Sequence, residues 1–314
     1  MYTATFLTVF DTVTTIKGRA ESEDAFSAIS QKIHDELLAY HQLFDIYNDY
    51  EGINNLKTIN DSAGVAPVKV DRRILDLLLD CKTYYEASGG KVNVAMGSVL
   101  QLWHVARNDG IRNPAEAYLP DQEALEEAAL HTNFSDVILD EQACTVYLSD
   151  PEMSLDVGAI AKGWSVEQVA KNAPEGFLIS VGGNVRATGP KDDAGTPWVI
   201  GIQDPRDAGS NLHTIYVSAG SLVTSGDYQR TYAVGDTLYH HIIDPETLYP
   251  STCWSSVTIL CPDSGLADAL STALFLMDQA EGQKLLNQFG AKALWVDREG
   301  NLYYSPGFQD LIRT

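Results

Sequence analysis

The clearest pair of candidate ligands in this sequence is Asp268 and Thr272, in the stretch GLADALSTALFLM. The stretch reads as a helix, and side chains one turn apart on a helix project from the same face. Ser264 is the expected N-cap, which places the pair near the positive end of the helix dipole. A carboxylate and a hydroxyl are hard oxygen ligands suited to Mg²⁺. The alternative is that Asp268 only helps the helix to begin while Thr272 packs, and spacing alone does not separate the two.

A second candidate is the segment SLDVGAIAKGW, at Ser154–Trp164. Asp156 comes shortly before Gly158, and Lys162 and Gly163 lead into a helical pattern. Glycine allows the backbone to come close to a ligand, and a helix N-terminus presents unpaired N–H groups to anionic oxygens. The segment therefore indicates a nucleotide or phosphate site, although it matches neither a Walker loop nor a GxGxxG fingerprint.

Tandem histidines, His240 and His241, precede an Ile-Ile pair and an Asp-Pro turn. Alternate residues of an extended chain face opposite sides, so one histidine should face a cleft or the core and the other the opposite side. A histidine is a natural proton acceptor for a hydroxyl nucleophile, and a hydrogen-bonded structural histidine is the alternative. Two segments rich in small residues, 180–185 and 225–230, are either close-approach sites for a ligand or ordinary turns.

The composition limits the class of ligand. The chain has 314 residues, 45% of them hydrophobic, and a formal net charge of −22. This charge argues against nucleic acid as a partner, because binding its backbone needs clustered Lys and Arg. An anionic ligand such as a dinucleotide would need help from a cation. The four cysteines include no CxxC pair, so we expect buried small hydrophobes rather than a zinc or haem site, with disulfides left open.

The sequence carries no membrane or export signal that we can identify. No stretch approaches the length of a transmembrane helix. The N-terminal stretch MYTATFLTVFDTVTTI alternates apolar and polar residues like a strand. It lacks a charged n-region followed by a long apolar h-region, so we expect no signal peptide in this chain.

Periodic patterns predict the elements that must position these residues. We expect helices at 26–44, 71–87, 121–130, 264–277 and 280–289, another that begins near 166, and a polar loop at 48–60. We expect strands at the N-terminus and at 137–139, 145–147, 177–181, 185–188, 198–203, 213–217, 229–232, 257–260 and 293–296. Strands of the second half follow one another without helices between them. A single compact α+β unit with mostly antiparallel sheets flanked by helices is therefore favoured over a doubly wound parallel sheet.

Six motifs together resemble the ApbE family, the FAD:protein FMN transferases. They are SLDVGAIAKGWSVE, SVGGNVRATGP, PWVIGIQDPR, SGDYQRTY, HHIIDPETLYP and SVTILCPDSGLADALSTALF. The resemblance covers about Asp156 to the C-terminus and is looser before it. It implies one ApbE-like, T-fold-related domain over residues 1–314. It also implies an enzyme that uses Mg²⁺ to cleave FAD and attaches FMN through a phosphoester bond to a threonine of an acceptor flavoprotein, releasing AMP.

The resemblance also implies roles for individual residues. The side chains of Asp268 and Thr272 and the backbone carbonyl of Ala159 would be metal ligands. His241 would be the base near the acceptor hydroxyl. Tyr47 would be an aromatic neighbour of the flavin, and Lys162 a cationic partner of the pyrophosphate. The implied FAD contacts are Phe10, Tyr47, Ala95, Met96, Gly97, Asp156, Lys162 and Ile243.

Two segments depart from the family pattern. This chain reads Phe10-Asp11-Thr12 where Met-Gly-Thr is usual, and Ala95-Met96-Gly97-Ser98 where Thr-Val-Gly-Pro is usual. Both departures fall on implied contacts to the flavin rather than on the metal site.

The resemblance implies an acceptor such as an electron-transport subunit or a flavin reductase. It further implies an extracytoplasmic lipoprotein that meets the membrane only through a lipid anchor, with a cytoplasmic location also open. Two other functions stay open: a Mg²⁺-dependent FAD pyrophosphatase that yields FMN and AMP, and a non-catalytic flavin-binding protein. The pair Asp268 and Thr272 and the candidate base His241 argue against storage alone, because storage needs neither a metal nor a base.

Overall fold

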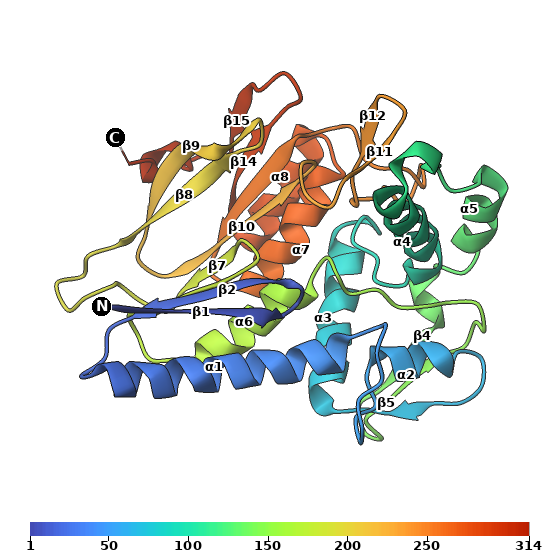
Figure 1. The fold of residues 1–314 in the computed structure, drawn as a ribbon, viewed down its shortest axis with the longest axis horizontal. Coiled ribbons are helices and arrows are strands. Elements are labelled where there is room, and N and C mark those ends of the chain that lie inside the picture. The colour runs from blue at the N-terminus through green and yellow to red at the C-terminus, as the bar shows by residue number, and fades with distance from the viewer. Residues whose placement is uncertain (314) are drawn as a thin grey trace. The chain divides into compact units, whose positions relative to one another are not determined.

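The computed structural model describes residues 1–313, which divide into two compact units (Figure 1). Unit 1 contains Met1–His41, Ile160–Gly226 and the chain from Cys253 onward, and unit 2 contains Gln42–Ala159 and Asp227–Thr252. Helices and antiparallel sheets occur in both units, so the predicted α+β class is confirmed. That residues 1–314 act as one domain stays a prediction.

Unit 1 is built on an eight-stranded sheet with the order β1-β2-β6-β7-β10-β13-β14-β15. Every neighbouring pair in this sheet is antiparallel. Its strands are β1 (Tyr2–Val9), β2 (Thr12–Gly18), β6 (Leu178–Val181), β7 (Asn184–Ala187), β10 (Gly220–Gly226), β13 (Ser256–Cys261), β14 (Lys292–Val296) and β15 (Leu302–Tyr304). The remaining elements are a hairpin of β8 (Trp198–Asp204) and β9 (Asp207–Val217), the helices α1 (Glu23–Phe44), α6 (Ala161–Asn172), α7 (Ser264–Phe275) and α8 (Gln279–Phe289), and a 3-10 turn, η3 (Gln309–Leu311).

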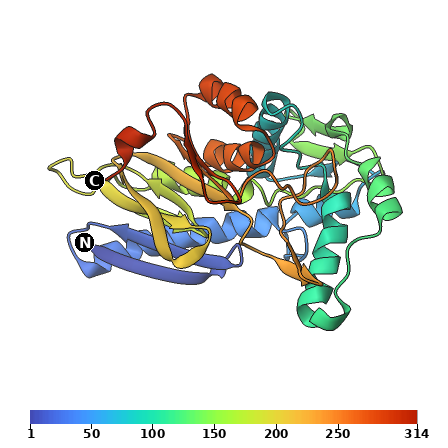
Figure 2. The ribbon, with the colours of Figure 1, turned by 90° about the horizontal axis from the view of Figure 1, so that it is seen from above.

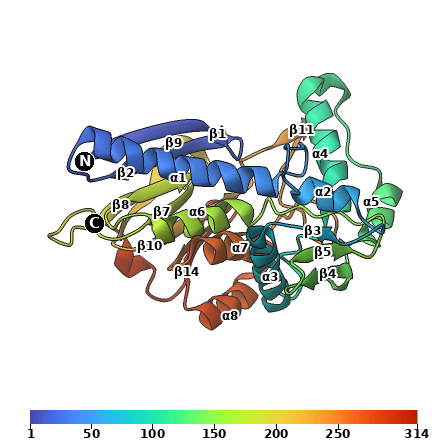
Figure 3. The same cartoon turned by 90° about the horizontal axis from the view of Figure 1, so that it is seen from below.

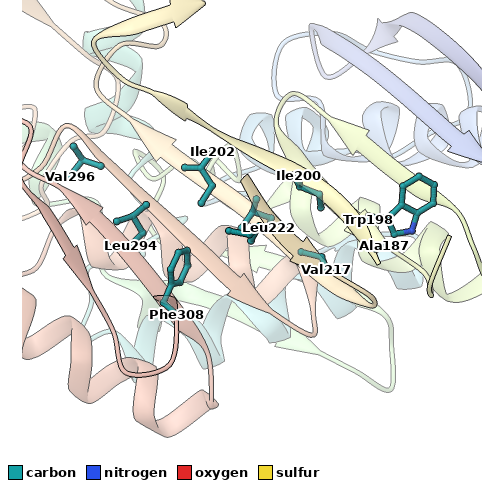
Figure 4. Close-up of a cluster of buried hydrophobic side chains, with 10 residues drawn as sticks. Ala187, Trp198, Ile200, Ile202, Val217, Leu222, Leu294, Val296 and Phe308 are labelled. Carbon is teal, nitrogen blue, oxygen red and sulfur yellow. The ribbon is translucent and has the colours of Figure 1, made fainter. Parts of the chain in front are cut away.

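The β8–β9 hairpin covers one face of this sheet (yellow in Figure 2). Ile200, Ile202 and Ile215 of the hairpin pack against Leu222 of β10 and Leu294 of β14 in a buried apolar cluster (Figure 4). The other face is covered by α6 and α7, which lie side by side (Figure 3). Because side chains alternate along a strand, neighbouring residues of the central strands serve two different layers.

Strand β7 shows this alternation clearly. Val185 and Ala187 contribute to the apolar cluster under the hairpin. Asn184 and Arg186 point the other way, and their side chains bind carboxylates on α7 and α6. The strand therefore presents polar groups only to the helix side, where the candidate metal ligands lie.

The N-terminal stretch forms two strands joined by a tight turn rather than one strand. Phe10 and Asp11 adopt left-handed backbone conformations, with φ of 53° and 50°. Two consecutive positive φ values are typical of the hairpin turn that matches the twist of the flanking strands. Periodicity did not reveal the turn, because Asp11 is the only turn-favouring residue there.

Unit 2 contains the helices α2 (Leu56–Asp61), α3 (Arg72–Ala87), α4 (Gly97–Arg112) and α5 (Gln122–Ala129). Its three-stranded sheet has the order β3-β5-β4, formed by β3 (Val68–Lys69), β4 (Val137–Asp140) and β5 (Thr145–Leu148). A hairpin of β11 (Tyr232–Val234) and β12 (Thr237–Tyr239) and two 3-10 turns, η1 (Pro114–Glu116) and η2 (Phe134–Asp136), complete it. One apolar cluster joins α4 to the chain after β12 through Trp103, Ile243 and Leu248.

Several predicted elements need correction. The expected loop 48–60 contains the start of α2, whose N-cap is Asn55. The expected strand 229–232 is wrong, because Arg230 has a φ of 50° and the strand begins only at Tyr232. Five further helices and strands of the described residues have no counterpart among the predictions, namely α4, β3, β10, β12 and β15.

The predicted cysteine chemistry is partly confirmed. No cysteine among residues 1–313 is in a disulfide. Cys81 and Cys261 are buried as expected, whereas Cys253 is exposed. No helix in this part of the chain has the length and apolar character needed to cross a membrane.

Candidate functional site

Asp268 lies on α7 and is held by groups from two other elements of unit 1. The residue as a whole is only 4% exposed. The backbone N–H of Gly163 donates to Asp268 Oδ2 at 2.8 Å, and Asn184 Nδ2 donates to the same oxygen at 2.9 Å. Within residues 1–313 no hydrogen bond reaches the second oxygen, Oδ1. One oxygen of the carboxylate is thus fixed by the protein, and the other can serve as a ligand.

The surroundings of Asp268 fit a hard cation bound together with an anionic ligand. Lys162 Nζ lies 3.8 Å from Asp268 Oδ2, so a positive charge accompanies the carboxylate. Thr272 follows one turn later on α7 and is half-buried, which agrees with its predicted place on the same face. No group of three or more His, Cys, Asp or Glu side chains with metal-binding geometry occurs in the described part of the chain. One carboxylate and one hydroxyl suit Mg²⁺, which commonly takes its other ligands from water and phosphate.

Gly163 serves the packing of α6 against α7. A Cβ built on Gly163 would contact the Ser264 carbonyl oxygen and would lie 2.5 Å from the Cβ of Asp268. Such distances are far inside van der Waals contact, so only glycine allows this approach. The sequence predicted that glycine would let the backbone approach a ligand, but at Gly163 the backbone approaches helix α7 instead. This approach allows the Gly163 N–H to reach the Asp268 carboxylate.

A second buried carboxylate supports the beginning of α7. Glu167 Oε2 accepts from Arg186 Nε at 2.9 Å and from the backbone N–H of Ser264 at 2.9 Å. Ser264 is not the N-cap as predicted, because Asp263 occupies that place and its side chain accepts from Leu266 N at 2.9 Å. The first turn of α7 is therefore stabilised by two carboxylates, in line with the positive end of its dipole.

In unit 2 the backbone brings two of the predicted segments together. Gly97 N donates to Ser154 O at 2.9 Å, and Asp156 N donates to Val94 O at 2.8 Å. A Cβ on Gly97 would lie 2.5 Å from the Ser154 oxygen, so glycine is required for this contact. The predicted FAD contacts at 95–97 and Asp156 are thus neighbours in the structure.

Tyr47 sits on a loop that is organised by Asp45. The Asp45 carboxylate accepts from the backbone N–H groups of Tyr47 and Asn48 at 2.7 and 3.1 Å. It also accepts from Asn48 Nδ2 at 2.9 Å and from the Tyr50 hydroxyl at 2.8 Å. These bonds lower the pKa of Asp45 although its burial opposes them. One carboxylate therefore fixes the backbone that carries the candidate flavin neighbour.

The phenol of Tyr47 meets a histidine of α4. The Tyr47 hydroxyl oxygen lies 2.9 Å from His104 Nδ1, and His104 Nε2 lies 3.9 Å from Asp156 Oδ2. Burial lowers the pKa of His104 although the Asp156 charge opposes this, so the ring is neutral at pH 7. Desolvation of the phenol end, followed by the Asp156 charge, raises the pKa of Tyr47 to about 12.

Two arginines act on the same group of side chains. Arg107, one turn after His104, and Arg230 both contribute positive charge to the surroundings of Tyr47 and His104. Burial and the charge of Arg230 lower the pKa of Arg107. Sequence reasoning did not identify His104, Arg107 or Asp45, and the helix that carries the first two was itself missed.

The tandem histidines separate as predicted. His240 is buried, with Nε2 donating to Ser251 O at 2.7 Å and Nδ1 accepting from Ile242 N at 3.2 Å. His240 is therefore the structural histidine. His241 is half-buried, and its Nδ1 lies 3.2 Å from Gln229 O. A carbonyl can only accept, so Nδ1 donates and the lone pair of the neutral ring is on Nε2.

Phe10 lies in the turn between β1 and β2 of unit 1. Its backbone N–H donates to His41 Nδ1 at 3.4 Å, and its ring makes an edge contact with the His41 ring, with centroids 5.5 Å apart. Ile243 belongs to the apolar cluster of unit 2 that also contains Met96. Ala159 is the last residue of its segment in unit 2, whereas Asp268 and Thr272 belong to unit 1. The part of the Ala159 carbonyl as a third metal ligand stays a prediction, as do the FAD contacts and the base His241.

Comparison with known proteins agrees with this arrangement of segments. A protein of Treponema pallidum (strain Nichols) named FAD:protein FMN transferase is 35% identical over 278 residues, which are 82% of this chain and 75% of the relative. One of Klebsiella pneumoniae (strain 342) with the same name is 33% identical over 267 residues, 81% of this chain and 80% of the relative. The crystal structure of the ApbE protein from Thermotoga maritima has a TM-score of 0.88 at 30% identity and covers 100% of this chain and 99% of that one.

The flavin transferase ApbE from Vibrio cholerae has the same fold, with a TM-score of 0.81 at 23% identity over 99% of both chains. The family model described as the ApbE family matches residues 9–295. This range includes the turn between β1 and β2, the buried carboxylates of Glu167 and Asp268, and the histidine pair. With nearly the whole chain matched in sequence and in fold, this protein belongs to the ApbE family.

Proposed function

We propose that this protein is an FAD:protein FMN transferase, which cleaves FAD and attaches FMN through a phosphoester bond to a threonine of an acceptor flavoprotein, releasing AMP. The names of the relatives support the donor and the transferred group. The observation that carries the proposal is the Asp268 carboxylate, fixed through Oδ2 by Gly163 and Asn184 with Lys162 beside it. A flavin-storage protein has no use for such an arrangement.

Asp268 and Thr272 would hold Mg²⁺, and the Ala159 carbonyl is a proposed third ligand. The donor set fits, because Mg²⁺ is bound through one or two carboxylates and completed by substrate phosphates and water. Mg²⁺ bound there would offset the charge of the pyrophosphate and polarise the phosphorus on the FMN side. A metal is needed on electrostatic grounds, since a chain of net charge −22 repels an anionic dinucleotide.

The protein's own groups would bind and orient the reactants. Lys162 would supply a fixed positive charge to the pyrophosphate. Tyr47, Asp156 and the backbone at 95–97 would bind the rest of FAD, together with Phe10 and Ile243. His241 would take the proton of the threonine hydroxyl on Nε2, because its Nδ1 donates to the Gln229 carbonyl. The acceptor would be an electron-transport subunit or a flavin reductase, and a lipid-anchored location outside the cytoplasm is proposed on the family resemblance.

The experiment that tests the proposal measures AMP released from FAD and Mg²⁺ with and without an acceptor protein. The proposal expects AMP release that depends on both Mg²⁺ and the acceptor, with FMN recovered on the acceptor. Rapid release of free FMN and AMP without an acceptor would instead identify an FAD pyrophosphatase. Tight FAD binding without AMP under any metal condition would identify a flavin-binding protein.

A further inference from the structure

Tyr47 combines an exposed side chain with a fixed position. Tyr47 is 57% exposed, compared with 43% for Tyr118 and Tyr216. Its backbone N–H donates to Asp45 Oδ1 at 2.7 Å, and its hydroxyl lies 2.9 Å from His104 Nδ1. Both ends of the residue are therefore held while the ring remains open to solvent. A rigid, open aromatic face is suited to stacking against a planar ring of a ligand.

The direction of the bond between Tyr47 and His104 follows from the surroundings of the histidine. Burial keeps the His104 ring neutral, so only one ring nitrogen carries a proton. Nε2 faces the Asp156 carboxylate at 3.9 Å, and a proton on Nε2 turns its N–H toward that negative charge. Nδ1 then has the lone pair and accepts from the Tyr47 hydroxyl. His104 thus connects Tyr47 to Asp156, both implied FAD contacts.

Two arginines act on the group formed by Tyr47, His104 and Asp156, and their positive charge favours an anionic ligand there. Arg107 is half-buried and makes no hydrogen bond or ion pair within residues 1–313. Arg230, in a left-handed backbone conformation, likewise has no ion pair in this part of the chain. The charges of Arg107 and Arg230 act on Tyr47 and His104, together with the opposite charge of Asp156.

We infer that His104 is a positioning residue for FAD binding: it fixes the Tyr47 ring as a preformed stacking face and links it to Asp156. The inference rests on the proposed function, because it assumes that Tyr47 and Asp156 contact FAD. Holding the ring in place before binding removes the loss of rotamer freedom that stacking would otherwise cause. The expected consequence is weaker binding of FAD, with little effect on the step that follows.

The test measures FAD binding through flavin fluorescence and the visible absorption band, without Mg²⁺ or acceptor, so that no turnover is involved. Tyr47→Phe removes only the hydroxyl, and His104→Ala removes the ring that accepts from it and that faces Asp156. Each should weaken FAD binding about threefold to tenfold, the range of one net hydrogen bond. The double variant should bind no more weakly than either single variant, because both changes remove the same contact.

His104→Asn provides the rescue, because its amide oxygen can take the place of Nδ1 and accept from Tyr47. It should bind FAD close to wild type. His131→Ala is the matched control: His131 also pairs with an aspartate in unit 2, with Nδ1 2.8 Å from Asp150 Oδ2, but does not contact Tyr47. It should leave FAD binding unchanged. In turnover assays, His104→Ala should raise the KM for FAD and change kcat little.

Two outcomes would overturn the inference. One is FAD binding by His104→Ala equal to wild type, and the other is a double variant whose loss equals the product of the single losses. Failure of the proposed function looks different: wild type would bind FAD but release no AMP with Mg²⁺ and acceptor, and the binding series would still report on His104. Circular dichroism and thermal unfolding of each variant separate loss of the contact from loss of the fold.

Discussion

The substitution Asp268→Asn separates the chemical part played by this carboxylate from its structural part. The amide oxygen of asparagine can occupy the place of Oδ2 and accept from Gly163 N and Asn184 Nδ2, which now lie at 2.8 and 2.9 Å. The amide nitrogen then replaces Oδ1, and an NH₂ group cannot ligate Mg²⁺. Asp268→Ala, by contrast, removes the acceptor of both bonds at a residue that is only 4% exposed.

The two variants should therefore differ in stability and agree in activity. Asp268→Ala leaves a buried backbone N–H unpaired and should lower the free energy of unfolding by about 2–4 kcal/mol. Asp268→Asn keeps both bonds without charge assistance and should lower it by only about 1 kcal/mol. Loss of metal-based charge stabilisation, worth several kcal/mol, should reduce AMP release at least about 100-fold in both.

The measurements are denaturant unfolding and chromatographic detection of AMP from FAD over a Mg²⁺ titration. Asp278→Asn, which alters a carboxylate at the N-cap of α8, is the control and should keep full activity. Wild-type rates of Mg²⁺-dependent AMP release by Asp268→Asn would refute the assignment of Asp268 as a metal ligand. Equal destabilisation by both variants would refute the inferred hydrogen bonding.

Three further predictions concern stability, each measured by denaturant unfolding. Gly163→Ala forces a Cβ against α7 and should lower the free energy of unfolding by about 1–3 kcal/mol, whereas Gly209→Ala, whose Cβ would meet nothing closer than 3.4 Å, should change it little. Arg186→Met leaves the buried Glu167 carboxylate without its cation and should cost about 3 kcal/mol; a neutral result would contradict the buried ion pair. Burial lowers the pKa of His104 from 6.5, so the contribution of its neutral ring to stability is present above pH 6.5 and is lost as the pH falls. His104→Asn should therefore weaken the fall in the free energy of unfolding at acid pH. An unchanged fall would argue against a buried neutral ring.

Patterns in the sequence predicted the elements whose residues follow one period. Helix α3 begins after Asp71, whose side chain accepts from Arg73 N, and ends before two glycines with positive φ. The missed elements lack such signals. Strand β10, GSLVTSG, is buried along most of its length between two layers, so it does not alternate and its small residues read as a loop. Helix α4 has no side-chain cap at Met96, and its start therefore has no mark in the sequence.

The candidate site was predicted only where its residues follow a local pattern in the sequence. The spacing of Asp268 and Thr272 on one helix is a local property, and the structure confirms it. What holds Asp268 is not local: Gly163 and Asn184 come from distant segments and meet only through the packing of α6, α7 and β7. The contact between Tyr47 and His104 likewise joins residues 57 positions apart. No periodic pattern can reveal such contacts.

The central claim is the transfer of FMN from FAD to a threonine of another protein. The most direct measurement is mass spectrometry of a candidate acceptor flavoprotein after incubation with this protein, FAD and Mg²⁺. The transferase predicts an acceptor heavier by one covalently bound FMN, located on a threonine by fragmentation, with AMP released in equal amount and neither product formed by Asp268→Asn. AMP and free FMN released beside an unmodified acceptor would contradict it.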